Sequence, residues 1–429
     1  MGTVRTTAMV VGIIIGASIF VQPSQVTGSV PSAGGVLAVW LTAGLLTLIG
    51  ALVIAELASA WPKTGGVYVY LRDAYSPAVG FLWGWAMFWT MHTGIAAVIA
   101  MVCARYVGSF VMLSDTGTRV VAMAAIVLLS TVNYLGVKPA SAVQAALTFI
   151  KVAAIIVIIG IAFALGEPAV QTADVAANAV TTRSFVLALI AGLFTFGGWH
   201  MVSYSAEETI DPVRTIPRAL LIGTLLVTGL YVALNAAYLY VLPIATVAAS
   251  TRVAADLADA VAPGAHGGAI VSVVVILSTL GALNGVLLAG PRVYLAMAND
   301  GLLFRWIGGV HPAHRTPHRA ILLQAVWSCV LIQTNTFRTL FTRVVYTEWI
   351  FFAMLAAALY FLRRRPGYAP AYRLRGYQVW SALFVGASAF IVGMQLYIEP
   401  VESAWGLLLV LSGLPVYLIW SRRPLSADR

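Results

Sequence analysis

Apolar segments long enough to cross a lipid bilayer follow one another along the whole chain. A spanning helix needs about 20 apolar residues, and twelve segments have roughly this length. They comprise residues 8–27, 35–60, 78–110, 118–135, 141–166, 183–206, 217–241, 268–298, 319–335, 338–362, 377–399 and 402–420. Only 9% of the 429 residues are charged, whereas about 25% are charged in a typical soluble domain. We therefore predict an all-α membrane protein with twelve transmembrane helices in one domain, residues 1–420, followed by a cytoplasmic tail, residues 421–429.

The distribution of basic residues predicts the orientation of these helices. Cytoplasmic loops of membrane proteins are enriched in Lys and Arg. With the amino terminus inside, seventeen of the 25 basic residues lie on the cytoplasmic side and six on the outer side, while Lys151 and Arg292 fall within spans. We therefore expect both termini in the cytoplasm of a cell-membrane protein. The net charge of +10 then reflects topology and lipid contact, not nucleic-acid binding.

The first apolar segment contains residues that weaken a helix. Gly12, Gly16 and Ser18 lie within it, with Pro23 shortly afterwards, and glycine costs a helix about 1 kcal/mol relative to alanine. We predict that the backbone opens around residues 16–18. Opened backbone is tolerated inside a membrane only where protein buries it or where it lines a wet cavity. The alternative is a continuous helix whose small residues form a packing face.

A second weak point lies five spans further on. Gly197 and Gly198 stand together in the middle of the sixth segment. Glycine-interrupted segments at corresponding positions of two halves point to a binding site at the membrane midplane. Because five is an odd number, the second set of five helices must be inverted relative to the first. We predict repeat one at 8–166, repeat two at 183–362 and two peripheral helices within 377–420.

Several motifs give the chain a family resemblance. Residues 16–20 read Gly-Ala-Ser-Ile-Phe, residues 61–72 contain Trp-Pro-Lys-Thr-Gly-Gly, and residues 80–85 read Gly-Phe-Leu-Trp-Gly-Trp. Further on, residues 193–199 are followed by Glu207 and Glu208, and residues 278–285 are followed by Arg292 and Asp300. Together they resemble the amino acid–polyamine–organocation transporter superfamily, and its L-type amino acid transporter branch in particular. The resemblance implies a LeuT-type fold with an inverted 5+5 repeat and broken helices 1 and 6, working by alternating access.

Two broken helices suit the two charged ends of an amino acid. The half-helix that restarts near Ser18 presents free N–H groups and a positive dipole end, which attract a carboxylate. We assign the carboxylate to the backbone at Gly16, Ala17 and Ser18. The half-helix that ends near Thr195 presents free carbonyls to an ammonium. We assign the ammonium to the carbonyls at Ile14, Phe194, Thr195 and Gly197. The alternative for Ser18 is a hydroxyl bonded back to its own helix.

Lys151 is a charged residue placed inside the fifth span. Such residues cost about 2.5–3.5 kcal/mol on insertion scales and usually mark a pathway. In the family that the chain resembles, a lysine in this span replaces a bound sodium ion. Its ammonium is expected to contact the opened backbone near residues 12–15 and the hydroxyls of Ser278 or Thr279. The alternative is a lysine that extends to the cytoplasmic surface.

The resemblance also implies roles for three aromatic residues. Tyr231 resembles a tyrosine beside the unwound first helix and is expected to link the substrate carboxylate to Lys151. Phe194 and Trp199 resemble gate residues, with the Phe194 ring covering the substrate side chain. The chain departs from the branch at Ala17 and Ser18, where Ser-Gly is usual. It also has His200 in place of an asparagine, and this histidine either confers pH dependence or is packed and neutral.

Charged residues near the span ends give further hypotheses. Glu207, Glu208, Asp211 and Arg214 are candidates for a cytoplasmic latch with Lys63 or Arg72, or for a solvated cluster. Arg292 is expected to point toward the cytoplasmic surface. Glu348 either carries a proton or lies at the outer surface. From the sequence, no carboxylate is expected near either break.

These features favour a sodium-independent exchanger of small and medium neutral L-amino acids. The alternative is a proton-coupled amino acid or polyamine symporter of the same fold. No spacing of nucleophile, base or metal-ligating residues indicates an enzyme, a metal site or a cofactor. Animal L-type transporters pair with a single-span glycoprotein through a cysteine in an outer loop. Because Cys103 and Cys329 both lie in apolar segments, we expect no disulfide-linked accessory subunit.

Overall fold

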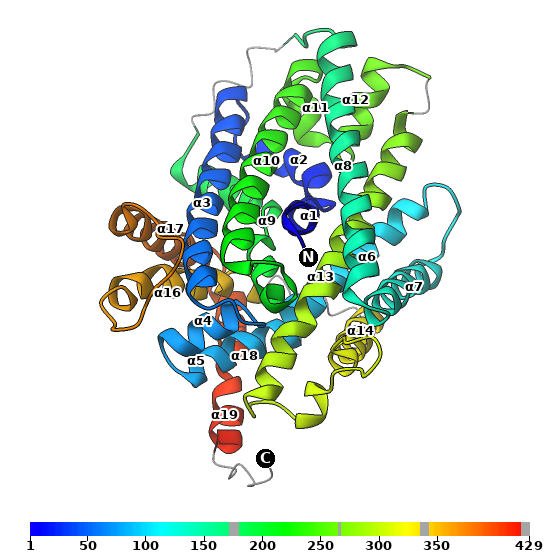
Figure 1. Ribbon diagram of the computed structural model, residues 1–429. Helices are drawn as coiled ribbons and strands as arrows, with labels where there is room; N and C mark the ends of the chain where they lie inside the picture. Colours follow the sequence, from blue (N-terminus) through cyan, green and yellow to red (C-terminus); the bar gives the residue numbers. More distant parts are fainter. Residues whose placement is uncertain (171–179, 265–266, 335–342, 422–429) are drawn as a thin grey trace.

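The computed structural model describes residues 1–170, 180–264, 267–334 and 343–421. Every regular element within these ranges is a helix, and the helices pack side by side in one bundle (Figure 1). Nine helices or helix runs of this part of the chain are long and apolar enough to cross a membrane, and a tenth candidate is the bent pair α1 and α2.

The candidate spans follow the apolar segments expected from the sequence. The bent pair consists of α1 (Thr3–Ile14) and α2 (Ser18–Ser29). The other candidates are α3 (Ala33–Ala60), a run from α5 (Pro77–Ala86) through η1 (Met87–Met91) to α6 (His92–Val107), α7 (Asp115–Tyr134), α8 (Val137–Leu165), a run from α9 (Thr182–Thr195) to η3 (Trp199–Glu208), α10 (Pro212–Val241), α13 (Gly267–Asn299), α17 (Tyr377–Ile398), and α18 (Pro400–Leu411) with α19 (Gly413–Ser421).

Two expected spans are shorter than the others. Helices α14 (His318–Gln333) and α16 (Thr347–Leu362) have 16 residues each, which is fewer than the about 20 that a perpendicular span needs. The start predicted for the tenth span, residues 338–342, lies outside the described residues, as does the predicted tail beyond Ser421. A total of twelve transmembrane helices therefore stays a prediction.

Polar caps and glycines explain where several helices begin. The Ser32, Ser76 and Ser114 side chains each accept a hydrogen bond from the backbone N–H three residues later, as helix N-caps do. The short helix α4 (Val67–Ala74) follows Gly66, whose φ is +47°. A side chain at Gly66 would meet Ser203 and Tyr204 of η3, so glycine lets this loop dock closely on η3.

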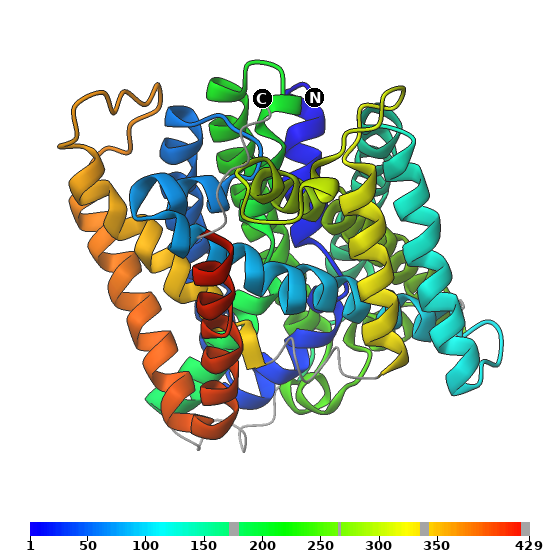
Figure 2. The ribbon, with the colours of Figure 1, turned by 90° about the horizontal axis from the view of Figure 1, so that it is seen from below.

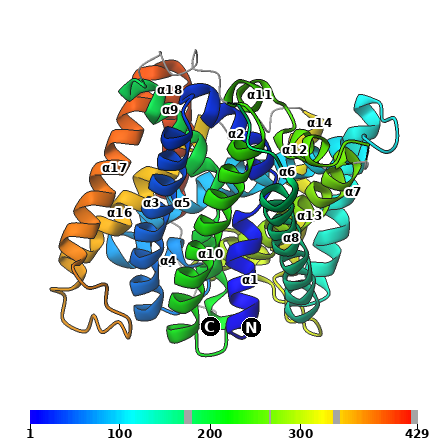
Figure 3. The same ribbon diagram turned by 90° about the horizontal axis from the view of Figure 1, so that it is seen from above.

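Helix α1 lies at the centre of the bundle. It packs against α8, α10 and α13, and Figure 3 shows it between these helices, with α17 and α7 at opposite edges of the molecule. Figure 2 shows the molecule from below, with α1 (blue) running from the N label at the upper edge toward the middle. Eight of its twelve residues are buried. In contrast, α8 and α10 each turn a row of large apolar side chains outward, as helices that face lipid do. The interior around α1 is therefore the part of the fold that is shielded from lipid.

The run from α5 to α6 contains a feature that the sequence did not predict. Residues Met87–Met91 form one π-helical turn, η1, and the Thr93 hydroxyl donates to the Phe88 carbonyl at 2.7 Å. Such turns interrupt α-helices frequently at functional sites. Here the turn ends at Met91, next to the cavity described below.

Candidate functional site

The first spanning segment is broken near the middle of the bundle. Helix α1 ends at Ile14, α2 begins at Ser18, and the two are bent by 46°. The Ile15 backbone leaves the helical region with ψ of 89°, and the Gly16 N–H donates to the Ile14 carbonyl at 2.9 Å. The opening is thus where the glycines predict it, but one residue earlier, since Ser18 is already helical. The last carbonyls of α1 and the first N–H groups of α2 have no partner within their own helix.

The second break lies directly beside the first. Helix α9 ends at Thr195, and Gly198 adopts a left-handed conformation with φ of +90° before η3 begins. A Cβ atom at Gly198 would lie 2.4 Å from Ile13 Cγ2, and a Cβ at Gly285 of α13 would lie 2.3 Å from Ile13 Cγ1. Ile13 of α1 is therefore held between two glycines. This packing brings the two predicted openings together.

Tyr231 joins the two breaks from α10. Its hydroxyl lies 3.1 Å from the Ile14 carbonyl oxygen and 3.3 Å from the Thr195 carbonyl oxygen. The ring is fully buried and packs edge-on against Phe196 and Trp40. Tyr231 thus bonds the carbonyl ends of both half-helices. The role expected from the family resemblance, a link from the substrate carboxylate to Lys151, stays a prediction.

Lys151 is fully buried and bonded to backbone carbonyls. Its ammonium donates to Gly12 at 2.9 Å, to Ile15 at 2.7 Å and to Ser278 at 2.9 Å. An ammonium has three protons, so all three are used. The side chain does not extend to the surface.

The contacts of Lys151 correct part of the sequence prediction. It meets the Ser278 carbonyl and not the hydroxyl, which instead lies 3.2 Å from the Gly16 carbonyl oxygen. The Thr279 hydroxyl bonds back to the carbonyls of Val275 and Ile276. Side chains of this kind often satisfy their hydroxyls within the helix, and in the described structure no hydrogen bond joins Thr279 to Lys151.

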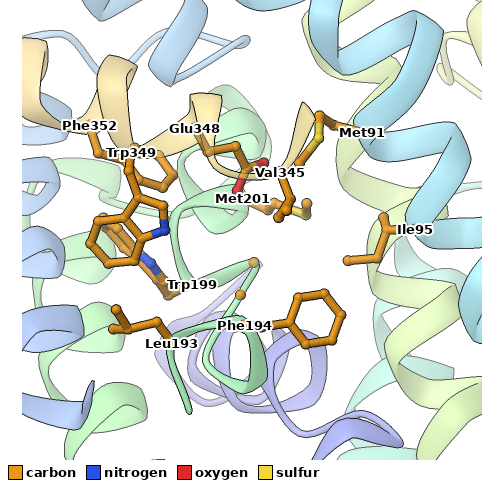
Figure 4. Close-up of a pocket in the computed structure, with 12 residues that line it drawn as sticks. Met91, Ile95, Leu193, Phe194, Trp199, Met201, Val345, Glu348, Trp349 and Phe352 are labelled. Carbon is orange, nitrogen blue, oxygen red and sulfur yellow. The ribbon is translucent and has the colours of Figure 1, made fainter. Parts of the chain in front are cut away.

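A cavity lies against the second break. Figure 4 shows its lining, which comes from the region of η1 and α6, from α9 and η3, and from the start of α16. The lining residues are Met91, Ile95, Leu193, Phe194, Gly197, Gly198, Trp199, Met201, Val345, Glu348, Trp349 and Phe352. The cavity thus includes the predicted site residues Phe194, Gly197 and Trp199. The residues of the first break and Tyr231 lie next to it and are not part of its lining.

Glu348 is the acidic residue of this lining, and the sequence does not predict its place beside a break. Its position was expected to be either a proton site or the outer surface, with no carboxylate near a break. In the fold, the first turn of α16 and the second break border one cavity, so Glu348 shares its lining with Gly197 and Gly198. The two segments are about 150 residues apart in the sequence. No spacing within either motif could have brought them together.

His200 is packed among aromatic rings. It lies fully buried between Trp83, Trp199, Tyr204 and Phe352, with ring centroids 4.9 to 5.7 Å away. Within the described part of the chain, neither ring nitrogen has a hydrogen-bond partner. A charged imidazolium would be costly in such a place. This environment favours the packed, neutral histidine over the pH-dependent one.

A group of polar contacts joins the ends of α4, η3 and α13. Arg292 is fully buried, donates to the Leu288 carbonyl one turn earlier in its own helix and pairs with Glu208 at 3.1 Å. Arg72 pairs with Asp73 and Asp300.

These pairs differ from the expected latch. Glu208 accepts a hydrogen bond from Arg292, because α13 places this arginine against the end of η3. Arg292 therefore does not point to the surface, contrary to the prediction from the sequence. Arg214 pairs loosely with Asp211 at 3.9 Å, and Glu207 accepts from the Thr64 hydroxyl at 2.7 Å. Neither Lys63 nor Arg72 forms an ion pair with Glu207 or Glu208 in the described structure.

Tyr68 of α4 completes this group outside the spans. Its hydroxyl donates to the Asp300 carboxylate at 2.6 Å. Burial and the adjacent carboxylate raise the pKa of Tyr68 well above its ordinary value. It therefore stays a neutral hydrogen-bond donor.

The fold and the site together define a class of protein. A bundle of apolar helices, two of them opened at glycines around a buried lysine, is a multi-pass membrane protein. A family model described as amino acid permease matches residues 1–420. The chain belongs to this family, which is part of the amino acid–polyamine–organocation superfamily. It is therefore a membrane protein of amino acid transport.

Similar proteins cover nearly the whole chain. The serine/threonine exchanger SteT of Bacillus subtilis is 30% identical over 429 residues, covering 99% of this chain and 98% of the relative. The human large neutral amino acids transporter small subunit 2 is 31% identical over 445 residues, covering 99% of this chain and 81% of the relative. The mouse Asc-type amino acid transporter 1 is 28% identical, with coverage of 100% and 83%. The family and these relatives are transporters.

Proposed function

We propose that the protein exchanges small and medium neutral L-amino acids across the cell membrane without sodium, by alternating access. The proposed architecture is the LeuT type, with twelve spans, inverted repeats at 8–166 and 183–362, peripheral helices within 377–420 and both termini in the cytoplasm. Similarity to a serine/threonine exchanger and to neutral amino acid transporters supports the substrate class. The observation that carries sodium independence is the position of the Lys151 ammonium.

The two breaks supply groups for both ends of the substrate. The first N–H groups of α2, at Ala17, Ser18 and the residues that follow, attract a carboxylate through hydrogen bonds and the helix dipole. The carbonyls at Ile14 and Thr195 suit the ammonium. In the structure these two carbonyls face the Tyr231 hydroxyl, so the tyrosine holds them in position beside the substrate.

Lys151 occupies the place of a cation among carbonyl oxygens. Three carbonyls from α1, its opened end and α13 converge on one ammonium at 2.7 to 2.9 Å. Such a set of oxygens would otherwise suit a metal cation. Because the charge is built into α8, α1 and α13 stay joined at the break without a bound ion. This favours transport that does not need sodium.

Phe194 and Trp199 are proposed as gates of the site. Both line the cavity beside the second break (Figure 4), and Trp199 stacks obliquely on Phe352 of α16 at 5.1 Å. Movement of α16 relative to η3 would open or close this aromatic layer. The pairs around Glu208 and Asp300 would hold the opposite side shut.

Exchange in liposomes tests this function. Liposomes containing the full chain are loaded with an unlabelled amino acid, and uptake of a labelled one is followed with sodium or choline as the external cation. We expect equal rates in both, and no effect of collapsing a pH gradient. Uptake that requires sodium would contradict the proposal, and uptake that follows the proton gradient would favour the proton-coupled alternative.

A matched pair of lysine variants tests the role of the buried ammonium. Lys151→Ala leaves buried carbonyl oxygens without their charged donor, at about 1–3 kcal/mol for each, so we expect exchange to fall at least about tenfold, equivalent to 1.4 kcal/mol. Lys138 is exposed on the same helix, and Lys138→Ala should leave exchange unchanged. Full activity of the Lys151→Ala protein would refute the assignment.

Cysteine placement supports operation without a disulfide-linked accessory subunit. Cys103 is buried in α6, and Cys329 lies partly buried in α14. Neither is in a loop that a partner could reach. Non-reducing electrophoresis of the protein from its native membrane tests this, since a thiol-sensitive heavier band would contradict it.

A further inference from the structure

Glu348 places a carboxylate inside a cavity that is otherwise apolar, aromatic or backbone. The remaining side chains of the lining are those of methionine, isoleucine, leucine, valine, phenylalanine and tryptophan. Figure 4 shows the Glu348 carboxylate reaching into this space beside Val345 and Met201, with Trp349 to one side. The second break, at Gly197 and Gly198, borders the same cavity.

The charge of Glu348 is not matched by the protein. Within the described residues, its carboxylate has neither a hydrogen bond nor an ion pair. Along the described chain, the basic residue nearest to Glu348 is Arg343, five positions earlier. Its guanidinium is already committed to Glu402, through both Nε and Nη2. Arg343 and Glu402 are both absent from the cavity lining.

The local backbone favours a negative charge at this position. Glu348 lies in the first turn of α16, where the helix dipole stabilises an anion by about 0.3–1 kcal/mol. Burial in apolar surroundings opposes the charge. An ionised Glu348 would therefore be stabilised most by a cation that enters the cavity.

The lining also suits the rest of a long cationic side chain. Methylene groups can pack against Met91, Ile95 and Phe194, because long cationic side chains bury their stems on apolar surface. Trp349 lies next to Glu348, and an ammonium near a tryptophan face gains a further cation–π attraction.

We propose that Glu348 determines side-chain specificity by binding an ammonium on the substrate side chain. The protein would then accept cationic L-amino acids as well as neutral ones. This inference rests on the proposed function, because it assumes that the amino acid backbone is held at the two breaks. The side chain then extends from the break at Gly197 toward α16, and Glu348 receives its charged end.

Competition between matched amino acids tests the proposal. Lysine and norleucine differ only by the terminal ammonium, as do ornithine and norvaline. Each competes against exchange of a labelled neutral amino acid in liposomes containing the full chain. We expect at least one cationic member to compete about tenfold better than its neutral partner, equivalent to 1.4 kcal/mol. The same preference should appear as thermal stabilisation of the purified protein, which reports binding without flux.

Three variants identify Glu348 as the cause. Glu348→Gln should remove the cationic advantage while neutral exchange continues, and Glu348→Asp should shift the optimum toward a longer diamino acid. Glu167 is an exposed carboxylate after α8, and Glu167→Gln should retain the native preference. If Glu348→Gln prevents folding, the Glu348→Asp shift decides the question.

Two results would overturn the inference. One is equal competition by the cationic and neutral partners in the native protein, and the other is an unchanged preference in Glu348→Gln or Glu348→Asp. Absence of all amino acid exchange and stabilisation in the native protein would overturn the proposed function and this inference together. Normal neutral exchange without cationic preference would overturn the inference alone.

Discussion

The packing of Ile13 between two glycines predicts how the two breaks depend on each other. Gly198→Ala introduces two separable costs. The first is the left-handed backbone with φ of +90°, which costs a residue with a Cβ about 1–2 kcal/mol. The second is the approach of the new methyl to 2.4 Å from Ile13 Cγ2, and such overpacking costs about 1–3 kcal/mol. The sum is about 2–5 kcal/mol.

Gly285→Ala carries only the second of these costs. Gly285 lies within the regular helix α13, and its methyl would approach Ile13 Cγ1 to 2.3 Å. Ile13→Ala removes both Cγ atoms of the isoleucine. Combined with Gly285→Ala it should recover most of the steric cost. Combined with Gly198→Ala it should recover only the steric part, leaving about 1–2 kcal/mol of backbone strain.

Thermal denaturation in detergent measures these differences. It is carried out on six proteins: the native protein, the three single variants and the two double variants. Exchange in liposomes then shows whether the same contacts set the geometry of the site. Gly229→Ala is the matched control, because nothing lies within 4 Å of its added methyl. Coupling of about 1–3 kcal/mol is expected for both double variants. Purely additive effects, or full recovery of Gly198→Ala by Ile13→Ala, would refute the reasoning.

Two further substitutions test the contacts around the site. Tyr231→Phe removes the hydroxyl that faces the carbonyls of both breaks, and we expect substrate affinity to fall about tenfold, or 1.4 kcal/mol. Tyr397→Phe, at a residue that is 79% exposed, should change nothing in the same competition assay. Glu208→Gln leaves Arg292 buried without its charge partner and should destabilise the protein by about 3–5 kcal/mol. Asp211→Asn, in an exposed pair, should cost no more than about 1 kcal/mol. Equal melting temperatures for Glu208→Gln and Asp211→Asn would contradict this account of Arg292.

Local chemistry explains what could be predicted from the sequence. Openings at residues 16–18 and 196–198 are visible in advance, because glycines inside an otherwise apolar span weaken the helix at a known place. The first opening begins one residue earlier than predicted. The burial of Lys151 follows from its position within a span and from the cost of leaving it unpaired. Its partners near residues 12–15 were implied by the family resemblance, and the structure shows them to be carbonyls at the opened end of α1.

Contacts between distant elements explain what could not be predicted. Glu348 lies near the second break only because the fold brings the first turn of α16 and the start of η3 to one cavity. Arg292 lies close to Glu208 because α13 packs against η3. Neither contact can be predicted from the spacing of residues along the sequence. The sequence likewise gives no sign of the π-helical turn at Met87–Met91, since its residues are typical of an ordinary apolar helix.

An experimental structure with a bound neutral L-amino acid tests the central claim most directly. The account predicts that the substrate carboxylate lies against the N–H groups at residues 16–18. It also predicts that the substrate ammonium lies against the carbonyls near Ile14 and Thr195, with the side chain directed into the cavity lined by Phe194 and Glu348. A substrate bound away from both breaks, or one whose carboxylate is held by a basic side chain, would contradict it.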